Sequence, residues 1–352
     1  MDPKLFNRQL LKWHKSHPRP MPWLGLSDPY KIWVSEIILQ QTRVEQGWNY
    51  YLNFTEKFPT IRALAEASQD SVLKQWEGLG YYSRARNIHK AANEIMITHK
   101  GVFPKHYDDV ISLPGIGPYT AAAVMSFAYG AKYPVIDGNV LRIVSRYCSI
   151  GEDLTKVKGR KKVLKFLEQA MDHTKDAAVF NQAIMNFGAL QCLPANPNCS
   201  VCPLRKNCVA LSKDLVAILP RAKVKIKKKK RYFTYIDLVD FSANRIINRR
   251  DEKDIWKGLY EFVLKETSAE WSPNSAQIVN YLKEIGITPK GETEVLARLK
   301  MKRILTHQLI IAEIITIRCD NFEYKGEKLL VTNRLQGYAF PKLLDLYLQT
   351  NL

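Results

Sequence analysis

The sequence predicts two domains, an all-α domain followed by an α+β domain, from three observations. The chain has 352 residues, about twice the length of a typical domain. Apolar residues recur at helical spacing through residues 1–215, and beyond residue 231 the pattern changes to the alternation of β-strands. Apolar and charged fractions of 46% and 25% are those of a globular protein, and they exclude a largely disordered chain.

Helices are predicted where apolar residues recur every three or four positions between turn signals such as Gly78–Gly80 and Asp137–Gly138. In the first domain they span residues 30–47, 61–68, 71–77, 83–98, 106–113, 118–129, 139–148 and 158–171. In the second domain, strict alternation predicts strands at 232–239 and 309–317, and helical spacing predicts helices at 275–285 and 339–349.

The net charge of +19 indicates a polyanionic partner, either nucleic acid or an anionic membrane surface. Residues 1–220 carry 28 Lys and Arg against 18 Asp and Glu, residues 221–231 carry eight against none, and residues 232–352 carry 17 against 16. So many like charges cannot pack against one another, which predicts a basic linker at 221–231 between domains 1–220 and 232–352. A solvated tether and a direct DNA contact both stay open for this linker.

The sequence also excludes some classes of protein. The first residues carry charge where a signal peptide needs an apolar core, and no stretch approaches the roughly 18 to 20 uncharged apolar residues of a membrane span. We therefore expect a soluble, cytoplasmic protein.

A hairpin motif follows residue 112. Leu113-Pro114-Gly115-Ile116-Gly117 is followed by a proline at the first position of an Ala-rich helix. Glycines permit close approach, and the backbone N–H groups at the start of the new helix can bind a phosphate. An ordinary helical hairpin is the alternative for a bare Gly-x-Gly, but the full run resembles the helix-hairpin-helix motif of the DNA glycosylase superfamily that includes endonuclease III.

A carboxylate occupies an apolar helix face near the start of the chain. On a helix, Glu36 shares its face with Ile32, Trp33, Leu39 and Gln40. Apolar surroundings destabilise the charged form and raise the pKa of a carboxyl, which suits a general acid. A buried glutamate satisfied by a neighbouring arginine is the alternative.

A second carboxylate, Asp137, follows an apolar run and opens a helix about twenty residues after the hairpin. This position predicts an N-cap. In the superfamily that the hairpin resembles, an Asp at this spacing in the context Asp-Gly-Asn-Val is catalytic, and the two roles are compatible.

Four of the six cysteines form a cluster with the spacing Cys192-x6-Cys199-x2-Cys202-x5-Cys208. In a reducing compartment such packing indicates a metal rather than disulfides. The four thiolates alone leave zinc and a 4Fe–4S cluster open. The remaining Cys148 and Cys319 stand alone and are expected in the core.

Several segments resemble MutY-type adenine DNA glycosylases, in the same order, from about Trp13 to Pro220. They are Ser-Glu-Ile-Ile-Leu-Gln-Gln-Thr at 35–42, the run 78–87, Phe-Asn-Gln-Ala-Ile-Met at 180–185 and the 6-2-5 cysteine spacing. The resemblance implies that the cofactor is a 4Fe–4S cluster, with Arg205 and Lys206 facing DNA phosphate.

The second domain supports the same family more weakly. Residues 254–262 resemble the Trp-x-Gly-Leu-Tyr segment of its Nudix-like domain, without the paired glutamates of Nudix hydrolases downstream. Leu305-Thr306-His307 lies where the family has its Phe-Ser-His loop, which recognises 8-oxoguanine. The resemblance therefore implies a recognition domain, although an ordinary strand turn remains an alternative for this loop.

The resemblance implies hydrolysis of the N-glycosidic bond of adenine mispaired with 8-oxoguanine or G in double-stranded DNA, by a monomer near the nucleoid. Lyase-competent relatives place a Lys where this chain has Tyr119, so no Schiff-base step is implied. Glu36 is implied as the acid and Asp137 as the group that stabilises the sugar cation, with Asn139 as the orienting residue and Tyr119 lining the sugar. Gln41 and Tyr81 are implied to wedge into the base stack. The implied DNA- or base-binding residues are Arg19, Leu39, Gln41, Thr42, Tyr81, Gly115, Gly117, Asn186, Thr306 and His307.

Two positions depart from the family pattern. Asn186 stands where the family usually carries an acid near the adenine pocket, and Leu24 stands where relatives often have a polar or basic residue. A bifunctional lyase acting on oxidised pyrimidines and a non-catalytic lesion-binding protein are the alternative functions.

Overall fold

The computed structural model describes residues 1–221, 227–250, 254–325 and 329–351, and the chain divides into two compact units. The first unit contains Met1–Glu66 and the chain from Asn87 up to the linker, and the second contains Ala67–Arg86 and the chain after the linker. The sequence predicts that residues 67–86 belong to the first domain, whereas the structure groups them with the second unit. Residues 222–226 of the predicted linker lie outside the described residues, and 229–231 already belong to a strand.

The first unit is entirely helical in its described part. Helix α6 begins in the second unit and continues into the first, whereas α5, Gln69–Gln75, belongs to the second. The helices of the first unit are α1 Pro3–Lys15, α2 Pro29–Leu39, α3 Val44–Lys57, α4 Ile61–Glu66, α6 Ser83–Thr98, α7 Tyr107–Ser112, α8 Pro118–Tyr129, α9 Gly138–Cys148, α10 Val157–Met171, α11 Ala177–Leu190, the 3-10 turn Arg205–Asn207 and α12 Val209–Ser212.

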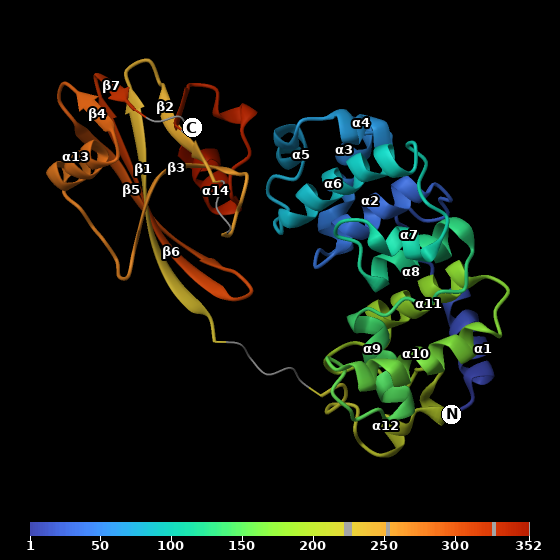
Figure 1. Cartoon of the computed structure of the whole chain (residues 1–352). Helices are drawn as coiled ribbons and strands as arrows, with labels where there is room; N and C mark the ends of the chain where they lie inside the picture. The colour runs from blue at the N-terminus through green and yellow to red at the C-terminus, as the bar shows by residue number, and fades with distance from the viewer. Residues whose placement is uncertain (222–226, 251–253, 326–328, 352) are drawn as a thin grey trace. The chain divides into compact units, whose positions relative to one another are not determined.

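These helices form two groups (Figure 1). Helix α1 packs against α10 and α11, while α2 packs against α3 and α8. Helix α11 contacts both α8 and α9 and therefore joins the groups. The functional cavity described below is lined by residues of both groups.

The predicted helix at 30–47 is wrong, because two helices occupy this range. Gln40 leaves the helix with ψ 109° and Gln41 adopts a left-handed φ of 57°, a conformation that is costly for a residue other than glycine. No glycine or proline marks this break, and apolar residues continue at helical spacing across it. The sequence therefore predicts one uninterrupted helix. Helices α1 and α11 also lie outside the predicted ranges, and α11 is apolar on nearly all sides, which weakens its periodicity.

The second unit is built on a six-stranded mixed sheet of order β5-β6-β1-β3-β2-β8. Strands β1 and β6 run parallel over twelve paired residues, and the other pairings are antiparallel. The strands are β1 Lys229–Asp240, β2 Arg245–Arg249, β3 Tyr260–Thr267, β5 Glu294–Ile304, β6 Gln308–Cys319 and β8 Leu329–Thr332, with β4 Ile287–Lys290 and β7 Asn321–Tyr324 in a separate pair.

Alternating residues of the sheet build a separate core on each face. Phe233 and Tyr235 of β1 pack with Leu344 of α14, Lys342–Asn351, and Ile236 of β1 packs with Leu282 of α13, Ser275–Glu284. This follows from the two-residue period of a strand. The fold confirms the predicted order of an all-α domain and an α+β domain. Among the described residues, no helix is long and apolar enough to cross a membrane.

Candidate active site

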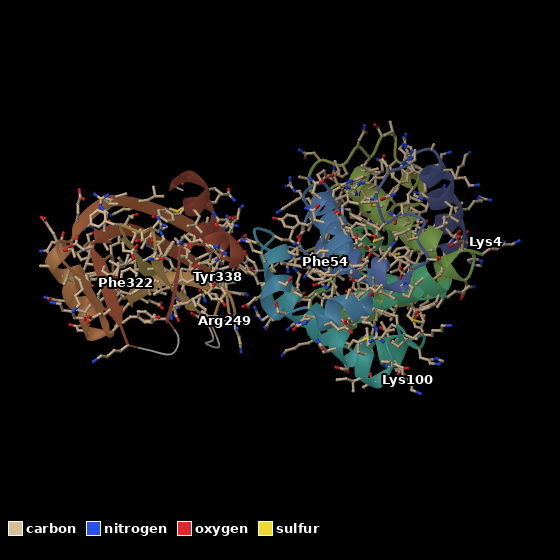
Figure 2. The ribbon with its side chains drawn as sticks, turned by 90° about the horizontal axis from the view of Figure 1, so that it is seen from above. Lys4, Phe54, Lys100, Arg249, Phe322 and Tyr338 are labelled. Atoms are coloured by element: carbon tan, nitrogen blue, oxygen red, sulfur yellow. The ribbon has the colours of Figure 1, made fainter. Side chains whose placement is uncertain are left out.

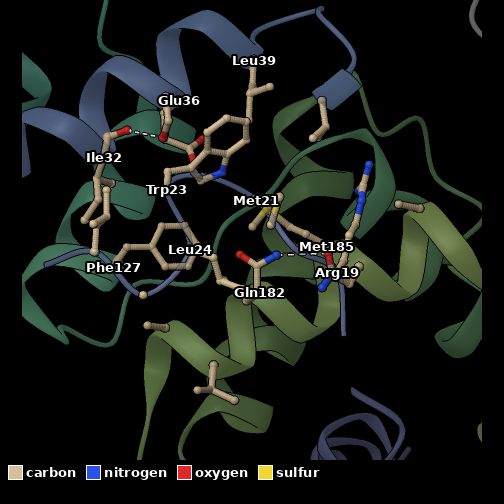
Figure 3. Close-up of a pocket in the computed structure, with 18 of the residues that line it drawn as sticks. Arg19, Met21, Trp23, Leu24, Ile32, Glu36, Leu39, Phe127, Gln182 and Met185 are labelled. Carbon is tan, nitrogen blue, oxygen red and sulfur yellow. Dashed lines mark hydrogen bonds between the residues drawn. The ribbon is translucent and has the colours of Figure 1, made fainter. Parts of the chain in front are cut away.

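A cavity of about 520 Å³ opens in the first unit between α2, α8, α9 and α11 (Figure 3). The segment 19–27, which links α1 to α2, closes one side. The structure brings together here eight of the residues singled out in the sequence, namely Arg19, Glu36, Leu39, Thr42, Tyr119, Asp137, Asn139 and Asn186.

Glu36 projects from α2 into this cavity and is 5% exposed. Its Oε2 atom has no hydrogen-bond partner, and it makes no ion pair among the described residues, so the alternative of a glutamate satisfied by an arginine does not hold. Burial raises the pKa of Glu36 from 4.5 to about 7, opposed by a hydrogen bond from Tyr119 and reinforced by the charge of Asp137. Near neutral pH this carboxyl can therefore hold and donate a proton.

Tyr119 lies at the first turn of α8, directly beside Glu36. Burial raises the pKa of its hydroxyl well above the usual range, and the nearby charges of Glu36 and Asp137 raise it further. The hydroxyl also lies 3.5 Å from the sulfur of Met185. Tyr119 thus stays protonated and acts in this cavity as a hydrogen-bond donor.

Asp137 is the N-cap of α9, as the sequence predicts. Its Oδ1 accepts the backbone N–H of Val140 at 2.7 Å, and its Oδ2 accepts the side-chain amide of Asn139 at 3.0 Å. The positive end of the helix dipole also favours a negative charge at this position. Both oxygens of Asp137 are therefore held in place by donors that stabilise the carboxylate form.

The side chain of Asn139 is itself held in place by Arg142 and by the close approach of α11. The guanidinium of Arg142 donates to Asn139 Oδ1 at 2.9 Å and to the carbonyl oxygens of Gly188 and Cys192 at 2.7 and 2.8 Å. A Cβ on Gly188 would lie 2.5 Å from that of Asn139, so α11 approaches this residue as closely as only glycine permits. These contacts fix the amide of Asn139 toward Asp137.

Met21, Trp23, Phe127, Gln182 and Met185 are among the lining residues for which the sequence predicts no role. Figure 3 shows Glu36 and Leu39 projecting from α2, with Gln182 and Met185 across the cavity on α11. The sequence signal that could have identified the cavity residues of α11 is helical spacing, because positions 182, 185, 186 and 189 lie on one face of the helix. Trp33, expected on the face of Glu36, does not line the cavity and packs against Phe103.

The two departures from the family pattern both lie at this cavity. Asn186 is buried, and its Oδ1 accepts the side-chain amide of Gln182 at 3.0 Å. Leu24 is 50% exposed at the cavity lining. The buried position is thus occupied by a neutral amide pair, and the exposed position by an apolar side chain.

Three further predicted residues of the first unit lie outside the cavity lining. Gln41 is exposed in the left-handed turn between α2 and α3. Gly115 has a φ of 79°, and a Cβ there would lie 2.6 Å from that of Asn87, so the turn between α7 and α8 needs glycine. Gly117 is the N-cap of α8 and has no side chain to satisfy the first N–H groups of that helix, which leaves them able to bind an anion.

The other predicted base-binding residues belong to the second unit. Tyr81, Thr306 and His307 line a pocket of about 760 Å³, and the hydroxyls of Tyr81 and Thr306 lie 3.3 Å apart. Tyr81 is 47% exposed with a left-handed φ of 49°. Arg303 and Lys342 line the same pocket, so it combines polar and cationic groups.

The four clustered cysteines line one small cavity of about 30 Å³ beside α9. No three His, Cys, Asp or Glu side chains in the described part of the chain are already arranged to hold a metal ion. Burial raises the pKa of Cys202 to about 12 and also raises that of Cys208, so these thiols stay protonated unless a bound cation stabilises their thiolate forms. Arg146 donates to Cys192 Sγ at 3.5 Å and to the carbonyl oxygens of Leu193 and Pro194.

Comparisons with known proteins agree with this geometry. Residues 34–169 match the family described as "HhH-GPD superfamily base excision DNA repair protein". The structure of a thermostable thymine-DNA glycosylase is similar with a TM-score of 0.56 at 27% identity, covering 60% of this chain and 97% of that one. An endonuclease III–DNA complex, with a TM-score of 0.52 at 21% identity over 61% and 99% of the chains, shares the fold. The first unit therefore has the helix-hairpin-helix fold of base-excision DNA glycosylases.

A curated relative identifies the family within this class of DNA glycosylases. The adenine DNA glycosylase of Buchnera aphidicola subsp. Acyrthosiphon pisum is 36% identical over 271 residues, which are 76% of this chain and 77% of the relative. The chain belongs to the adenine DNA glycosylase family, and the resemblance found in the sequence is confirmed.

Proposed function

We propose that this chain is a base-excision-repair enzyme that hydrolyses the N-glycosidic bond of adenine in DNA. One observation carries the proposal: a buried glutamate with a pKa of about 7 shares a single cavity with an aspartate whose two oxygens accept hydrogen bonds from Val140 and Asn139. A cavity of about 520 Å³ has the size of a small-molecule site, sufficient for one base and its sugar.

The two carboxyl groups divide the reaction. Glu36 donates its proton to N7 of adenine, which allows the glycosidic bond to break and the base to leave with the bonding electrons. Asp137 stabilises the oxocarbenium-like sugar, either as an ion or through a transient adduct. Water then adds to the sugar carbon and gives its proton to the Glu36 carboxylate, which restores the acid, as in two-carboxylate glycosidases. Asn139 positions Asp137 or the water, and Tyr119 lines the sugar side.

Adenine enters the cavity by base flipping. Gln41 and Tyr81 are the wedge residues of the proposal, supported by their exposure and by the left-handed backbone that each adopts. Arg19, Leu39, Thr42 and Asn186 contact the flipped nucleotide from the cavity wall, and the hairpin N–H groups after Gly115 and Gly117 bind phosphate.

The absence of an amine at Tyr119 supports a monofunctional enzyme. A Schiff base with the sugar requires a primary amine at the attacking position, and the phenol beside Glu36 cannot form one. We therefore assign hydrolysis without strand cleavage.

The opposing base is assigned to the second unit. Thr306 and His307 supply hydrogen-bonding groups in the pocket that also contains Tyr81. 8-Oxoguanine differs from guanine in the hydrogen-bond donors and acceptors of its modified edge. Hydrogen bonds to that edge can therefore distinguish the two bases. We assign adenine opposite 8-oxoguanine or G as the substrate and place the enzyme with DNA in the cytoplasm, as a monomer.

Cys192, Cys199, Cys202 and Cys208 would hold a 4Fe–4S cluster, since their shared cavity offers four thiols. When bound, the cluster supplies a cationic centre that keeps the thiols ionised and orders the loop. Arg205 and Lys206 in that loop are assigned to DNA phosphate. Purified protein should be brown, with absorbance near ~400 nm, whereas a colourless zinc protein would reject this assignment.

Single-turnover incubation with three duplexes tests the function. Adenine opposite 8-oxoguanine and adenine opposite G should both lose adenine, and a duplex with thymine glycol should remain intact. Borohydride should trap no covalent complex. Cleavage at thymine glycol with trapping would indicate a lyase, and binding without base release would indicate a lesion-binding protein.

A further inference from the structure

One face of α1 carries a row of positive charge that the proposed reaction does not use. Lys4, Arg8, Lys12 and Lys15 are separated by four, four and three positions, so they lie along one face of the helix. At a rise of 1.5 Å per residue the row is about 16 Å long. All four side chains are exposed, and Figure 2 shows Lys4 extending away from the ribbon of α1.

These cations line a groove of about 600 Å³ together with the exposed His173. None of the four makes an ion pair with any residue that the structure describes. Asp2 is the acid of the groove, but its Oδ1 accepts the backbone N–H groups of Lys4 and Leu5 at 2.9 and 3.0 Å. The positive charge of the row is therefore not neutralised within the described protein.

The opposite face of α1 fixes the row rigidly to the first unit. Phe6 and Leu10 are fully buried, and the Phe6 ring packs edge-on against Phe166 of α10 at 5.2 Å. Asn7 donates to the carbonyl oxygen of Ala170 at 2.9 Å. Like charges four residues apart destabilise a helix, so tertiary packing holds together an arrangement that the helix alone disfavours.

We propose that this face of α1, defined by Lys4, Arg8, Lys12 and Lys15, binds the phosphates of duplex DNA outside the lesion site. The inference rests on the proposed function, which brings duplex DNA to the first unit. Cations about 6 Å apart suit a polymer with regularly repeated charge. Protein-binding hot spots are enriched in Trp and Tyr as well as Arg, and in the described part of the chain neither Trp nor Tyr lines this groove.

The test compares a fourfold variant, K4Q/R8Q/K12Q/K15Q, with a fourfold control at exposed lysines of other elements, K57Q/K90Q/K132Q/K283Q. Both remove four positive charges. Binding to an undamaged 60-bp duplex is measured across a salt series. Each phosphate contact contributes about 0.9 to the slope of log K against log salt, so the α1 variant should lower the slope by about two to four and weaken binding at least tenfold. The control should change the slope by less than one.

Single-turnover release of adenine at saturating protein separates this inference from the proposed function. The α1 variant should keep the wild-type rate, because none of its substitutions lies at the cavity of Glu36. An unchanged slope and affinity in the variant, or an equal change in the control, would overturn the inference. A wild type that binds DNA without releasing adenine would instead overturn the proposed function. The double variant K12Q/K15Q should show about half the effect and serves if the fourfold variant unfolds.

Discussion

Glu36 and Asp137 line one cavity but sit in opposite environments. Glu36 lies midway along a buried helix, and one of its oxygens lacks a hydrogen bond. Asp137 lies at a helix start, and its two oxygens accept hydrogen bonds from Val140 and Asn139. The first environment favours the neutral acid, whereas the second supplies hydrogen-bond donors and the positive end of a helix dipole. Two carboxyl groups with opposed environments are suited to the two halves of a glycosidic cleavage.

The largest expected effect comes from removing the proton of the buried acid. Replacing Glu36 with Gln keeps the shape of the side chain but leaves no transferable proton, so single-turnover adenine release should fall by about 10³-fold. Affinity for the mispaired duplex should stay within a few-fold of wild type. Glu56→Gln, at an exposed glutamate of α3, is the matched control. Turnover at the wild-type rate in the Glu36 variant would remove Glu36 from the acid role.

Asp137→Asn should lower adenine release by about 10²-fold or more, because the charge opposite the sugar cation is lost. Asn caps helices as well as Asp, so the free energy of unfolding should change little. Asp137→Ala should also lose the hydrogen bond to Val140 and cost about 1 kcal/mol. Asn274→Ala, which removes the side-chain cap of α13, is the control. It should lower the free energy of unfolding by a similar amount and leave adenine release unchanged. An inactive Asn variant that is also unfolded would mean that the charge is structural.

The pH dependence of the free energy of unfolding should report the raised pKa of Glu36. Its pKa is raised from 4.5 to about 7 in the folded state, so the unfolded chain releases this proton first. The contribution of Glu36 is fully present below pH 4.5 and is lost as pH rises toward 7, by up to about 3 kcal/mol. Glu36→Gln cannot ionise, and denaturation at pH 4 and pH 8 should show the variant gaining stability over wild type at the higher pH only. Equal differences at both pH values would contradict the raised pKa.

The smallest effect concerns the phenol beside the acid. The hydrogen bond from Tyr119 lowers the pKa of Glu36, so Tyr119→Phe should raise that pKa further. Adenine release by wild type should decline tenfold per unit above pH 7, and in the variant this decline should begin at higher pH by less than one unit. Tyr30→Phe is the control, because Tyr30 also lies on α2 but donates its hydroxyl to the carbonyl oxygen of Phe58 and does not line the cavity. A shift toward lower pH would show that Tyr119 favours the neutral acid instead.

The sequence anticipated the local features of this site well. The apolar face around Glu36 and the N-cap position of Asp137 both follow from spacing within one helix. The cavity wall could not be anticipated in the same way, because Trp23, Phe127 and Met185 belong to three segments that are distant in the sequence and come together only when the chain folds. The turn at Gln41 was missed because its left-handed backbone has no glycine to announce it.

The domain boundary shows the same limit. Helical spacing placed residues 67–86 with the other helices, whereas Asp70 accepts a hydrogen bond from Tyr260 at 2.9 Å and Glu77 accepts the backbone N–H of Phe340 at 2.7 Å. These partners are 190 and 263 residues away. No local pattern carries information about such pairs.

The parallel pairing of β1 with β6 has a consequence for how the chain can change in length. Because Tyr235 and Ile236 feed different cores, a one-residue insertion within β1 would exchange the two faces and bury every side chain on the wrong side. An insertion before Lys229 leaves the register from Lys229↔Gln308 onward intact. A change of length inside β1 should therefore disrupt the sheet, whereas an insertion before Lys229 should leave its register unchanged.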